Sequence, residues 1–258
     1  MPNQTDVARL IDVIAGWLQE HRAAAGADGF VLGLSGGIDS ATVCGLCVRA
    51  AGAANVFAAI MPSASNPLDA EHALLVAERF GVETLRVELT PVTEALATAV
   101  SATADWRPPA DRARLASANI KPRLRMTTLY YLANLRNGLV VGTGNKSEAM
   151  IGYFTKYGDG GVDLLPIVDL YKHEVRSLAR ELGVPEPVIA KPPSAGLWPG
   201  QTDEGEIGLS YDELDCALVA IAVNDTASVP AAHLDRVEAM MHGSEHKRRS
   251  VPAFRRDA

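Results

Sequence analysis

The chain has 258 residues, of which 48% are hydrophobic and 21% are charged, and its formal net charge is −7. This length allows one large domain or two small ones, and the acidic balance argues against a general nucleic-acid-binding surface. No apolar run approaches the roughly 20 residues that cross a bilayer, and the N-terminal sequence lacks the pattern of a secretory signal. Because three cysteines do not suggest a disulfide framework, we predict a protein of the reducing cytoplasm, with neither membrane nor nucleic-acid partners.

The first half of the chain alternates predicted helices with predicted strands. An amphipathic helix is expected over residues 6–26, where apolar side chains recur at helical spacing. The segments that follow are a strand at 29–34, a helix at 39–51, a strand at 55–62, a helix at 67–81, a strand at 82–89 and a helix at 91–103. Such alternation is typical of a parallel sheet covered by helices, so we predict a single α/β domain with a doubly wound parallel sheet and helices on both faces.

The second half of the chain contains longer connections. The polar, proline-containing segment 104–117 is expected to be a connection, and residues 155–163 and 185–210 are expected to be irregular. The elements predicted between and after them are a helix at 119–136, a strand at 138–144, a short helix at 148–154, a helix at 172–184 and two helices near the C-terminus. Residues from about 244 to 258 form a basic tail, which could become ordered only when substrate binds.

The stretch "SGGIDS" at residues 35–40 lies between a predicted strand and a predicted helix, where open α/β sheets bind ligands. Gly36 and Gly37 allow successive N–H groups to converge on an anion, and the start of the helix adds positive potential. The chain contains neither a Walker loop with its lysine nor the glycine pattern of dinucleotide-binding folds. Because Asp39 would repel phosphate unless Mg²⁺ bridges the two, the loop predicts phosphate and metal binding. The alternative is an ordinary turn in which Asp39 only starts the helix.

Cys44 and Cys47 form a C-x-x-C pair inside the helix that follows this loop. The pair could act in redox chemistry or supply half of a metal site, or it could be two small apolar residues one helical turn apart. We favour the last interpretation, because no second pair or histidine cluster completes a site. Cys216 lies alone in a later apolar segment, where we interpret it as a packing residue.

Several motifs together resemble a known family. "SGGIDS" is similar to the pyrophosphate loop of the N-type ATP pyrophosphatases, which split ATP into AMP and pyrophosphate. The later segments that resemble the NAD synthetase signature are "VVGTGNKSEAMIGYFTKYGDGGVDLLPIVDLYKHEV", "KPPSAGLWPGQTDEGEIGLSYDELD" and "EHKRR". The resemblance covers nearly the whole chain and implies one adenine nucleotide α-hydrolase-like domain over residues 1–258. It also implies a ligase that uses ATP and ammonia to convert nicotinic acid adenine dinucleotide to NAD through an adenylate.

The resemblance implies which residues bind ATP and metal. Asp39 and Glu148 match the family's magnesium-binding carboxylates, and Lys172 matches a lysine that contacts ATP phosphates. The implied ATP-binding residues are Gly33, Leu34, Ser35, Gly36, Gly37, Ile38, Asp39, Ser40, Thr143, Lys172 and Ser194. Ser194 replaces the threonine of many members but keeps the hydroxyl. "GTGNKSE" departs from the "GTDHAAE" of some members, which leaves the contacts of that loop open.

A second group of residues is implied for the dinucleotide. The matching positions are Arg123, Lys156, Asp163, His246 and Lys247. Asp159 lies in the glycine-rich run between two of them and could hold ammonium and accept a proton from it. The implied catalytic residues are therefore Asp39, Lys172 and Asp159, which act by positioning and charge neutralisation without a covalent enzyme intermediate.

The family resemblance leaves the nitrogen source and the partners partly open. The chain is expected to use free ammonia, because it leaves no room for a glutaminase domain, although a separate glutaminase could supply the ammonia. A homodimer that binds the dinucleotide at its interface is expected. Two other functions are weighed: a different ATP pyrophosphatase, such as a tRNA-thiolating enzyme that uses Cys44 and Cys47, and a non-catalytic nucleotide-binding homologue.

Overall fold

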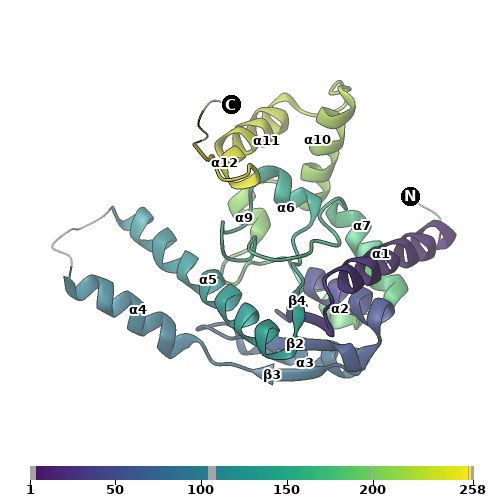
Figure 1. The fold of residues 1–258 in the computed structure, drawn as a ribbon. Coiled ribbons are helices and arrows are strands. Elements are labelled where there is room, and N and C mark those ends of the chain that lie inside the picture. The colour runs from purple at the N-terminus through teal and green to yellow at the C-terminus, as the bar shows by residue number, and fades with distance from the viewer. Residues whose placement is uncertain (1–3, 104–108, 199, 255, 257–258) are drawn as a thin grey trace.

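The computed structural model describes residues 4–103, 109–198, 200–254 and 256, and its centre is a parallel sheet (Figure 1). In the described part of the chain the sheet has the strand order β3-β2-β1-β4. The strands are β1 (Gly29–Gly33), β2 (Val56–Ile60), β3 (Glu83–Arg86) and β4 (Gly138–Val140). All pairings are parallel, and Phe30 of β1 lies opposite Val56 of β2 and Leu139 of β4. The predicted parallel sheet is confirmed.

Alternate side chains of the central strand enter two separate apolar clusters. Phe30 and Leu32 of β1 pack on one face of the sheet, and Val31 packs on the other. The first face is covered by α1 (Gln4–Ala24), α2 (Ile38–Ala51), α3 (Pro67–Phe80) and α7 (Lys172–Leu182). The opposite face is covered by α5 (Ala110–Arg136), which contributes Leu129 and Leu132. A strand buried on both faces needs apolar residues at every position, which explains why "GFVLGL" does not alternate.

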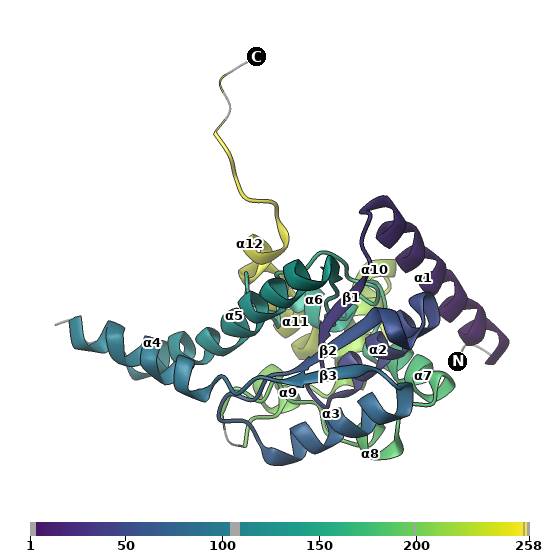
Figure 2. The ribbon, with the colours of Figure 1, turned by 60° about the horizontal axis from the view of Figure 1, so that its bottom comes forward.

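Helices α4 (Thr90–Thr103) and α5 contact each other and together are called the arm: α4 and the start of α5 project from the body in both views, while the later part of α5 covers the sheet (Figures 1 and 2). The prediction of a connection over 104–117 is wrong for its second half, because α5 begins at Ala110. Pro109 occupies the position before the helix, and the residues that follow it are mostly the good helix formers alanine, arginine and leucine. Residues 104–108 lie outside the described part of the chain.

The second half of the chain adds a smaller cluster of helices beside the sheet. Its elements are α6 (Lys146–Ile151), α9 (Asp203–Ile207), α10 (Tyr211–Val223), α11 (Ala231–Gly243) and α12 (Glu245–Arg248). The short helix α8 (Glu186–Ile189) packs with α2 and α7 on the first face of the sheet, and a 3-10 turn, η1 (Ala53–Asn55), lies earlier in the chain. Apolar residues such as Ile151, Leu214 and Val237 form the core of this cluster. The prediction that 185–210 is irregular is wrong where α8 and α9 form, because both are too short to show helical periodicity. None of the described helices is long and apolar enough to cross a membrane.

Candidate active site

The "SGGIDS" loop joins the carboxyl end of β1 to the start of α2, as predicted. Leu34 N–H still donates to the Ala59 carbonyl, so the loop starts on the sheet. Ser35 and Ser40 then hold the turn together: their hydroxyls lie 3.0 Å apart, and Ser40 Oγ donates to the Gly37 carbonyl. The hydroxyls also accept from the loop's own backbone, Ser40 Oγ from the Ser35 N–H and Ser35 Oγ from the Gly37 N–H. The donors left to meet an anion are the remaining backbone N–H groups of the loop and of the start of α2.

Gly36 has a left-handed backbone, with φ near 73°, at the point where the loop meets α3. A side chain at Gly36 would collide with the backbone carbonyl of Asp69. Lys191 bridges the same two segments, because its Nζ lies 2.6 Å from Asp69 Oδ1 and 3.3 Å from the Gly36 carbonyl oxygen. Sequence reasoning missed Lys191, since one lysine before two prolines has no distinguishing pattern. The structure thus adds a cation beside the loop.

The ends of two neighbouring strands bring Asp39 and Glu148 together. Asp39 follows β1 and Glu148 follows β4, and these strands are adjacent in the sheet. Asn145 joins the two sides: its Nδ2 donates to Asp39 Oδ1 at 2.9 Å, and its Oδ1 accepts from the Glu148 N–H at 3.0 Å. Glu148 in turn accepts from the Asn145 N–H, which completes a capping box on α6. The pattern N-x-x-E could have identified Asn145 from the sequence.

Lys172, the first residue of α7, lies between these two carboxylates. Its Nζ donates to Asp39 Oδ2 at 2.6 Å and to Glu148 Oε1 at 3.1 Å. The Lys172 side chain is 1% exposed, and its Nζ lies 4.6 Å from the centre of the Tyr211 ring. The structure therefore brings together three residues that are widely separated in the sequence. Their roles towards ATP and metal stay predictions.

Negative charge exceeds positive charge around Lys172, in a group that we call the acidic cluster: Asp39, Glu148, Asp203 and Lys172. The Tyr211 hydroxyl donates to Asp203 Oδ2 at 3.0 Å and lies 3.3 Å from Glu148 Oε1, so a further carboxylate borders the group. Burial raises the pKa of Glu148 to about 7 although Lys172 opposes the shift, and burial also raises the pKa of Asp203. Burial disfavours the charge on Lys172, but Asp39 and Glu148 overcome this and raise its pKa. Additional positive charge would therefore stabilise the cluster.

A magnesium ion bound together with a nucleotide fits this donor set. Mg²⁺ usually takes one or two carboxylates and completes its octahedron with phosphate and water oxygens. Asp39 and Glu148 supply two such carboxylates at adjacent strand ends. Among the described residues no group of three histidine, cysteine, aspartate or glutamate side chains forms a ready-made metal site. The donor set thus matches a metal that arrives with substrate phosphates.

The other two predicted ATP-binding residues lie in connections near the cluster. Thr143 is half-buried in the turn between β4 and α6. Ser194 Oγ donates to the Gln201 carbonyl at 2.7 Å and accepts from the Gly196 N–H at 3.2 Å. In this structure the Ser194 hydroxyl therefore shapes its own loop, and its contact with ATP stays a prediction.

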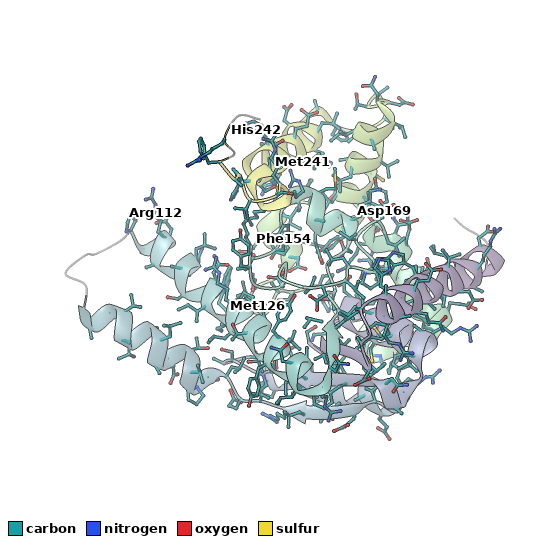
Figure 3. All side chains as sticks on the ribbon, viewed as in Figure 1. Arg112, Met126, Phe154, Asp169, Met241 and His242 are labelled. Atoms are coloured by element: carbon teal, nitrogen blue, oxygen red, sulfur yellow. The ribbon has the colours of Figure 1, made fainter. Side chains whose placement is uncertain are left out.

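Four of the five residues predicted to bind the dinucleotide lie close together, and we call them the basic group: Arg123, Lys156, His246 and Lys247. Arg123 Nη2 donates to the Lys156 carbonyl at 3.4 Å, and Lys156 Nζ donates to the His246 carbonyl at 2.7 Å. Lys247 Nζ donates to the carbonyls of Gly152 and Phe154 at 2.7 and 2.8 Å. Figure 3 shows Phe154 between α5, which carries Met126, and the C-terminal helices, which carry Met241 and His242. Residues 245–248 of the predicted basic tail form α12 here, and ordering by substrate stays a prediction.

The two aspartates of this region have different surroundings. Asp163 accepts from the Tyr130 hydroxyl at 2.9 Å and from the Val140 N–H at 2.8 Å. Its carboxylate therefore joins α5 to the end of β4. Asp159 accepts from the Thr155 N–H at 2.9 Å. Asp159 is accessible to solvent, yet the protein around it removes enough hydration to raise its pKa, against the influence of Lys247. The raised pKa makes Asp159 a stronger proton acceptor than an ordinary aspartate.

Helix α6 connects the two groups of residues. Glu148 lies in its first turn, and Gly152, which binds Lys247, directly follows its last turn. Glu148 and Gly152 are four residues apart, which is about 6 Å along a helix, so α6 joins the acidic cluster to the Lys247 end of the basic group. The arrangement can hold ATP phosphates at one end and a second anionic substrate at the other.

The cysteines take no part in either group. Cys44 and Cys47 are buried in α2, and burial raises the pKa of the Cys44 thiol to about 12. A thiol with such a pKa is a poor nucleophile and metal ligand, which supports the packing interpretation of this pair. The interpretation of Cys216 as a packing residue is wrong, because Cys216 lies on the exposed side of α10.

Comparisons with known proteins match this fold over nearly the whole chain. The family model for NAD synthase matches residues 10–251. An NH3-dependent NAD(+) synthetase from Archaeoglobus fulgidus is 48% identical over 251 residues, which are 96% of this chain and 96% of that protein. A solved structure of an NMN synthetase from Francisella tularensis has a TM-score of 0.86 and 36% identity, and it covers 96% of this chain and 98% of its own.

A solved structure of an NH3-dependent NAD synthetase from Campylobacter jejuni has a TM-score of 0.81 and 30% identity, and the match covers 96% of this chain and 99% of that one. These matches extend over both the sheet and the helical cluster beside it, so they include every residue group described above. The resemblance seen in the sequence is confirmed, and the chain belongs to the NAD synthase family.

Proposed function

We propose that the protein catalyses the ATP-dependent amidation of nicotinic acid adenine dinucleotide with ammonia, which yields NAD, AMP and pyrophosphate. The observation that carries this proposal is the convergence of Asp39, Glu148 and Lys172 where β1 and β4 end, in a chain of the NAD synthase family. The enzyme is a ligase that forms a C–N bond and uses ATP as a substrate.

In the first step a carboxylate oxygen of the nicotinate attacks the α-phosphorus of ATP. The bond to the β-phosphate oxygen breaks, so pyrophosphate leaves and an adenylate forms. The remaining N–H groups of the 35–40 loop and the start of α2 would bind the phosphates, and the Lys172 ammonium beside Asp39 would contact them. Asp39 and Glu148 would hold Mg²⁺, which when bound supplies positive charge that neutralises the departing pyrophosphate.

In the second step ammonia attacks the activated carbonyl carbon, and AMP leaves with the electrons of the broken C–O bond. Ammonia must react as NH₃, so a proton has to leave ammonium or the tetrahedral intermediate. Asp159 is suited to accept this proton, because its pKa is raised and its carboxylate is held by the Thr155 N–H. Arg123, Lys156 and Lys247 border the same place and would hold the phosphates of the dinucleotide.

The proposal includes a homodimer, the cytoplasm as location, and free ammonia as nitrogen source. The arm of α4 and α5 exposes large apolar side chains to solvent, which supports association with a second copy; they include Val92, Leu96, Leu115, Tyr131 and Leu135. The free cysteines agree with a reducing compartment. A separate glutaminase remains an alternative source of ammonia.

A second candidate is amidation of nicotinic acid mononucleotide, which is half of the dinucleotide. The likeness to the Francisella NMN synthetase, with its TM-score of 0.86, favours testing this substrate. Both reactions begin with adenylation of a nicotinate carboxylate, so the acidic cluster described above serves either one. The substrates differ only in the adenylate half that the basic group would have to hold.

One assay separates these candidates. Purified protein is supplied with ATP, Mg²⁺ and ammonium together with either the dinucleotide or the mononucleotide. We expect NAD, AMP and pyrophosphate in equal amounts, and a kcat/KM that favours the dinucleotide. Formation of ADP, or no NAD at any ammonium concentration, would contradict the proposal. Asp39→Asn should abolish adenylation, and Asp159→Asn should raise the KM for ammonium while adenylation continues.

A further inference from the structure

Helix α10 directs two buried polar side chains at the acidic cluster and at the residues next to it. Tyr211 and Asp215 are four residues apart, so they lie on one face of the helix, one turn from each other. Their exposed fractions are 0% and 3%. Burial of polar groups is unfavourable unless they form hydrogen bonds, so the bonds of these two residues show what the helix face contacts.

Tyr211 contacts the side chains of the cluster. Its hydroxyl lies 3.0 Å from Asp203 Oδ2 and 3.3 Å from Glu148 Oε1, and its ring lies under the ammonium of Lys172. The ring therefore limits where Lys172 can go, and the hydroxyl limits how Glu148 can turn. Neither contact requires a nucleotide.

Asp215 contacts the residues next to the same two side chains. It accepts from Ser147 Oγ, and it also accepts from His173, with the backbone N–H at 3.1 Å and Nδ1 at 2.9 Å. Ser147 directly precedes Glu148, and His173 directly follows Lys172. The Lys172 N–H donates to Ser147 Oγ at 3.0 Å, so Ser147 also binds the first residue of α7 directly. One carboxylate therefore fastens the start of α6 to the start of α7.

We propose that Tyr211 and Asp215 are positioning residues that set the geometry of Glu148 and Lys172 before ATP binds. This inference rests on the proposed function. Tyr211 acts on the two side chains directly, and Asp215 acts on the backbone that carries them. Packing alone would not require the Tyr211 hydroxyl, because phenylalanine has the same ring without the buried polar atom. Asp215 is the acceptor for Ser147 Oγ and the His173 N–H, so its contribution is specific to the two helix starts.

The test compares Tyr211→Phe and Asp215→Asn with the unaltered enzyme. Tyr211→Phe keeps the ring but loses the hydroxyl, and Asp215→Asn keeps the shape but loses one acceptor. Residues that orient metal ligands typically contribute 10- to 100-fold, so we expect kcat/KM for ATP at limiting Mg²⁺ to fall by about that factor. The KM for the dinucleotide should stay within about 2-fold. A purely structural role would instead lower the amount of active enzyme and leave every KM unchanged.

Asp212→Asn is the matched control, because Asp212 is on the same helix but its side chain is 77% exposed and pairs with Arg176. It should retain activity within about 2-fold. If Asp215→Asn does not fold, Ser147→Ala removes the same connection from its other end.

A double-mutant cycle tests whether Tyr211 acts through Glu148. In a Glu148→Gln background, Tyr211→Phe should lower the residual rate by less than about 2-fold, because coupled residues are not additive. An unaltered enzyme without NAD synthesis would refute the proposed function. An active enzyme whose Tyr211→Phe and Asp215→Asn variants keep the same ATP and Mg²⁺ dependence would refute the positioning role alone.

Discussion

Lys172 is the residue on which the charge balance of the site depends. Its buried ammonium is shared by Asp39 and Glu148, so both carboxylates lose their nearest positive charge if it is removed. Removing one partner of a buried ion pair typically costs about 3 kcal/mol or more. We expect Lys172→Met to abolish adenylation and to lower the free energy of unfolding by about that amount, measured by urea denaturation at pH 7.

The double variant Lys172→Met, Glu148→Gln provides the control for this prediction. It removes one of the two carboxylates that the single variant leaves unpaired, so part of the lost stability should return while activity stays absent. If the double variant is less stable than Lys172→Met, mutual repulsion of the carboxylates is not the cause of the loss.

Asn145 offers a second residue-level test, since it combines a helix cap with a contact to Asp39. Asparagine and aspartate are equally good caps, so Asn145→Asp preserves the capping of α6. It also replaces the amide that donates to Asp39 by a carboxylate that repels it. We expect the variant to lose at least about 1 kcal/mol of stability and most of its adenylation rate, in thermal unfolding and pyrophosphate-release assays.

Asn66→Asp is the same substitution at the exposed cap of α3, where the side chain accepts from the Leu68 N–H. Its stability should change by no more than about 0.5 kcal/mol. If Asn145→Asp and Asn66→Asp change the stability equally, the contact between Asn145 and Asp39 contributes nothing to stability.

At the scale of single elements, the sequence predicts best what neighbouring residues determine. The glycines and serines of "SGGIDS" form their turn with bonds inside the turn, so the loop is found where it is expected. Tyr211 and Asp203 are polar residues in ordinary amphipathic or irregular segments, and their role arises only when α10 packs against α6. The start of α5 was missed because the prolines at 108 and 109 suggested a connection, although proline is tolerated at the beginning of a helix.

The turn at Gly36 allows an element-level prediction. A left-handed backbone costs a non-glycine residue about 1–2 kcal/mol, and a methyl group here would also meet the Asp69 carbonyl. We expect Gly36→Ala to lower stability by at least about 2 kcal/mol and to raise the KM for ATP, because the loop must move away from α3. Circular-dichroism melting and initial rates would measure both effects.

Gly16→Ala is the opposite case, because Gly16 lies inside α1 with open space where its side chain would be. Alanine is the better helix former, so this variant should gain about 0.5–1 kcal/mol and keep full activity. If Gly36→Ala does not lower the stability, or if it changes the stability by no more than Gly16→Ala does, the turn at Gly36 is not strained.

For the whole molecule, strand order explains why distant motifs meet. Neighbouring parallel strands end at the same edge of the sheet, so the motifs after β1 and β4 must lie side by side. The alternating sequence predicts such an edge but not which strands are neighbours, so Asp39 and Glu148 could be paired only through the family resemblance. The helical cluster of α10 to α12 is even less predictable, because its place depends on packing against α6 and not on the sheet.

The arm of α4 and α5 carries the last prediction, which concerns association of two copies. Tyr131 and Leu135 are 65% and 67% exposed and lie one turn apart on α5. Neighbouring apolar side chains that are exposed to solvent mark a candidate protein–protein interface. In a symmetric dimer each substitution acts twice, so Tyr131→Lys with Leu135→Lys should weaken association at least about 100-fold. Sedimentation should show the unaltered enzyme at twice 27.3 kDa and the variant as a monomer at micromolar concentration.

Val223→Lys supplies the comparison, because Val223 is an equally exposed apolar residue on α10, far along the chain from the arm. It should leave the dimer intact if the arm is the interface. A monomeric unaltered enzyme would contradict the dimer itself, whereas loss of the dimer in Val223→Lys but not in the arm variant would move the interface to the C-terminal helices. If the dinucleotide binds at the interface, the monomeric variant should also have a raised KM for the dinucleotide, because Arg123 lies on the same helix as the substituted residues. Its KM for ATP should stay unchanged, because Lys172 lies on a different helix.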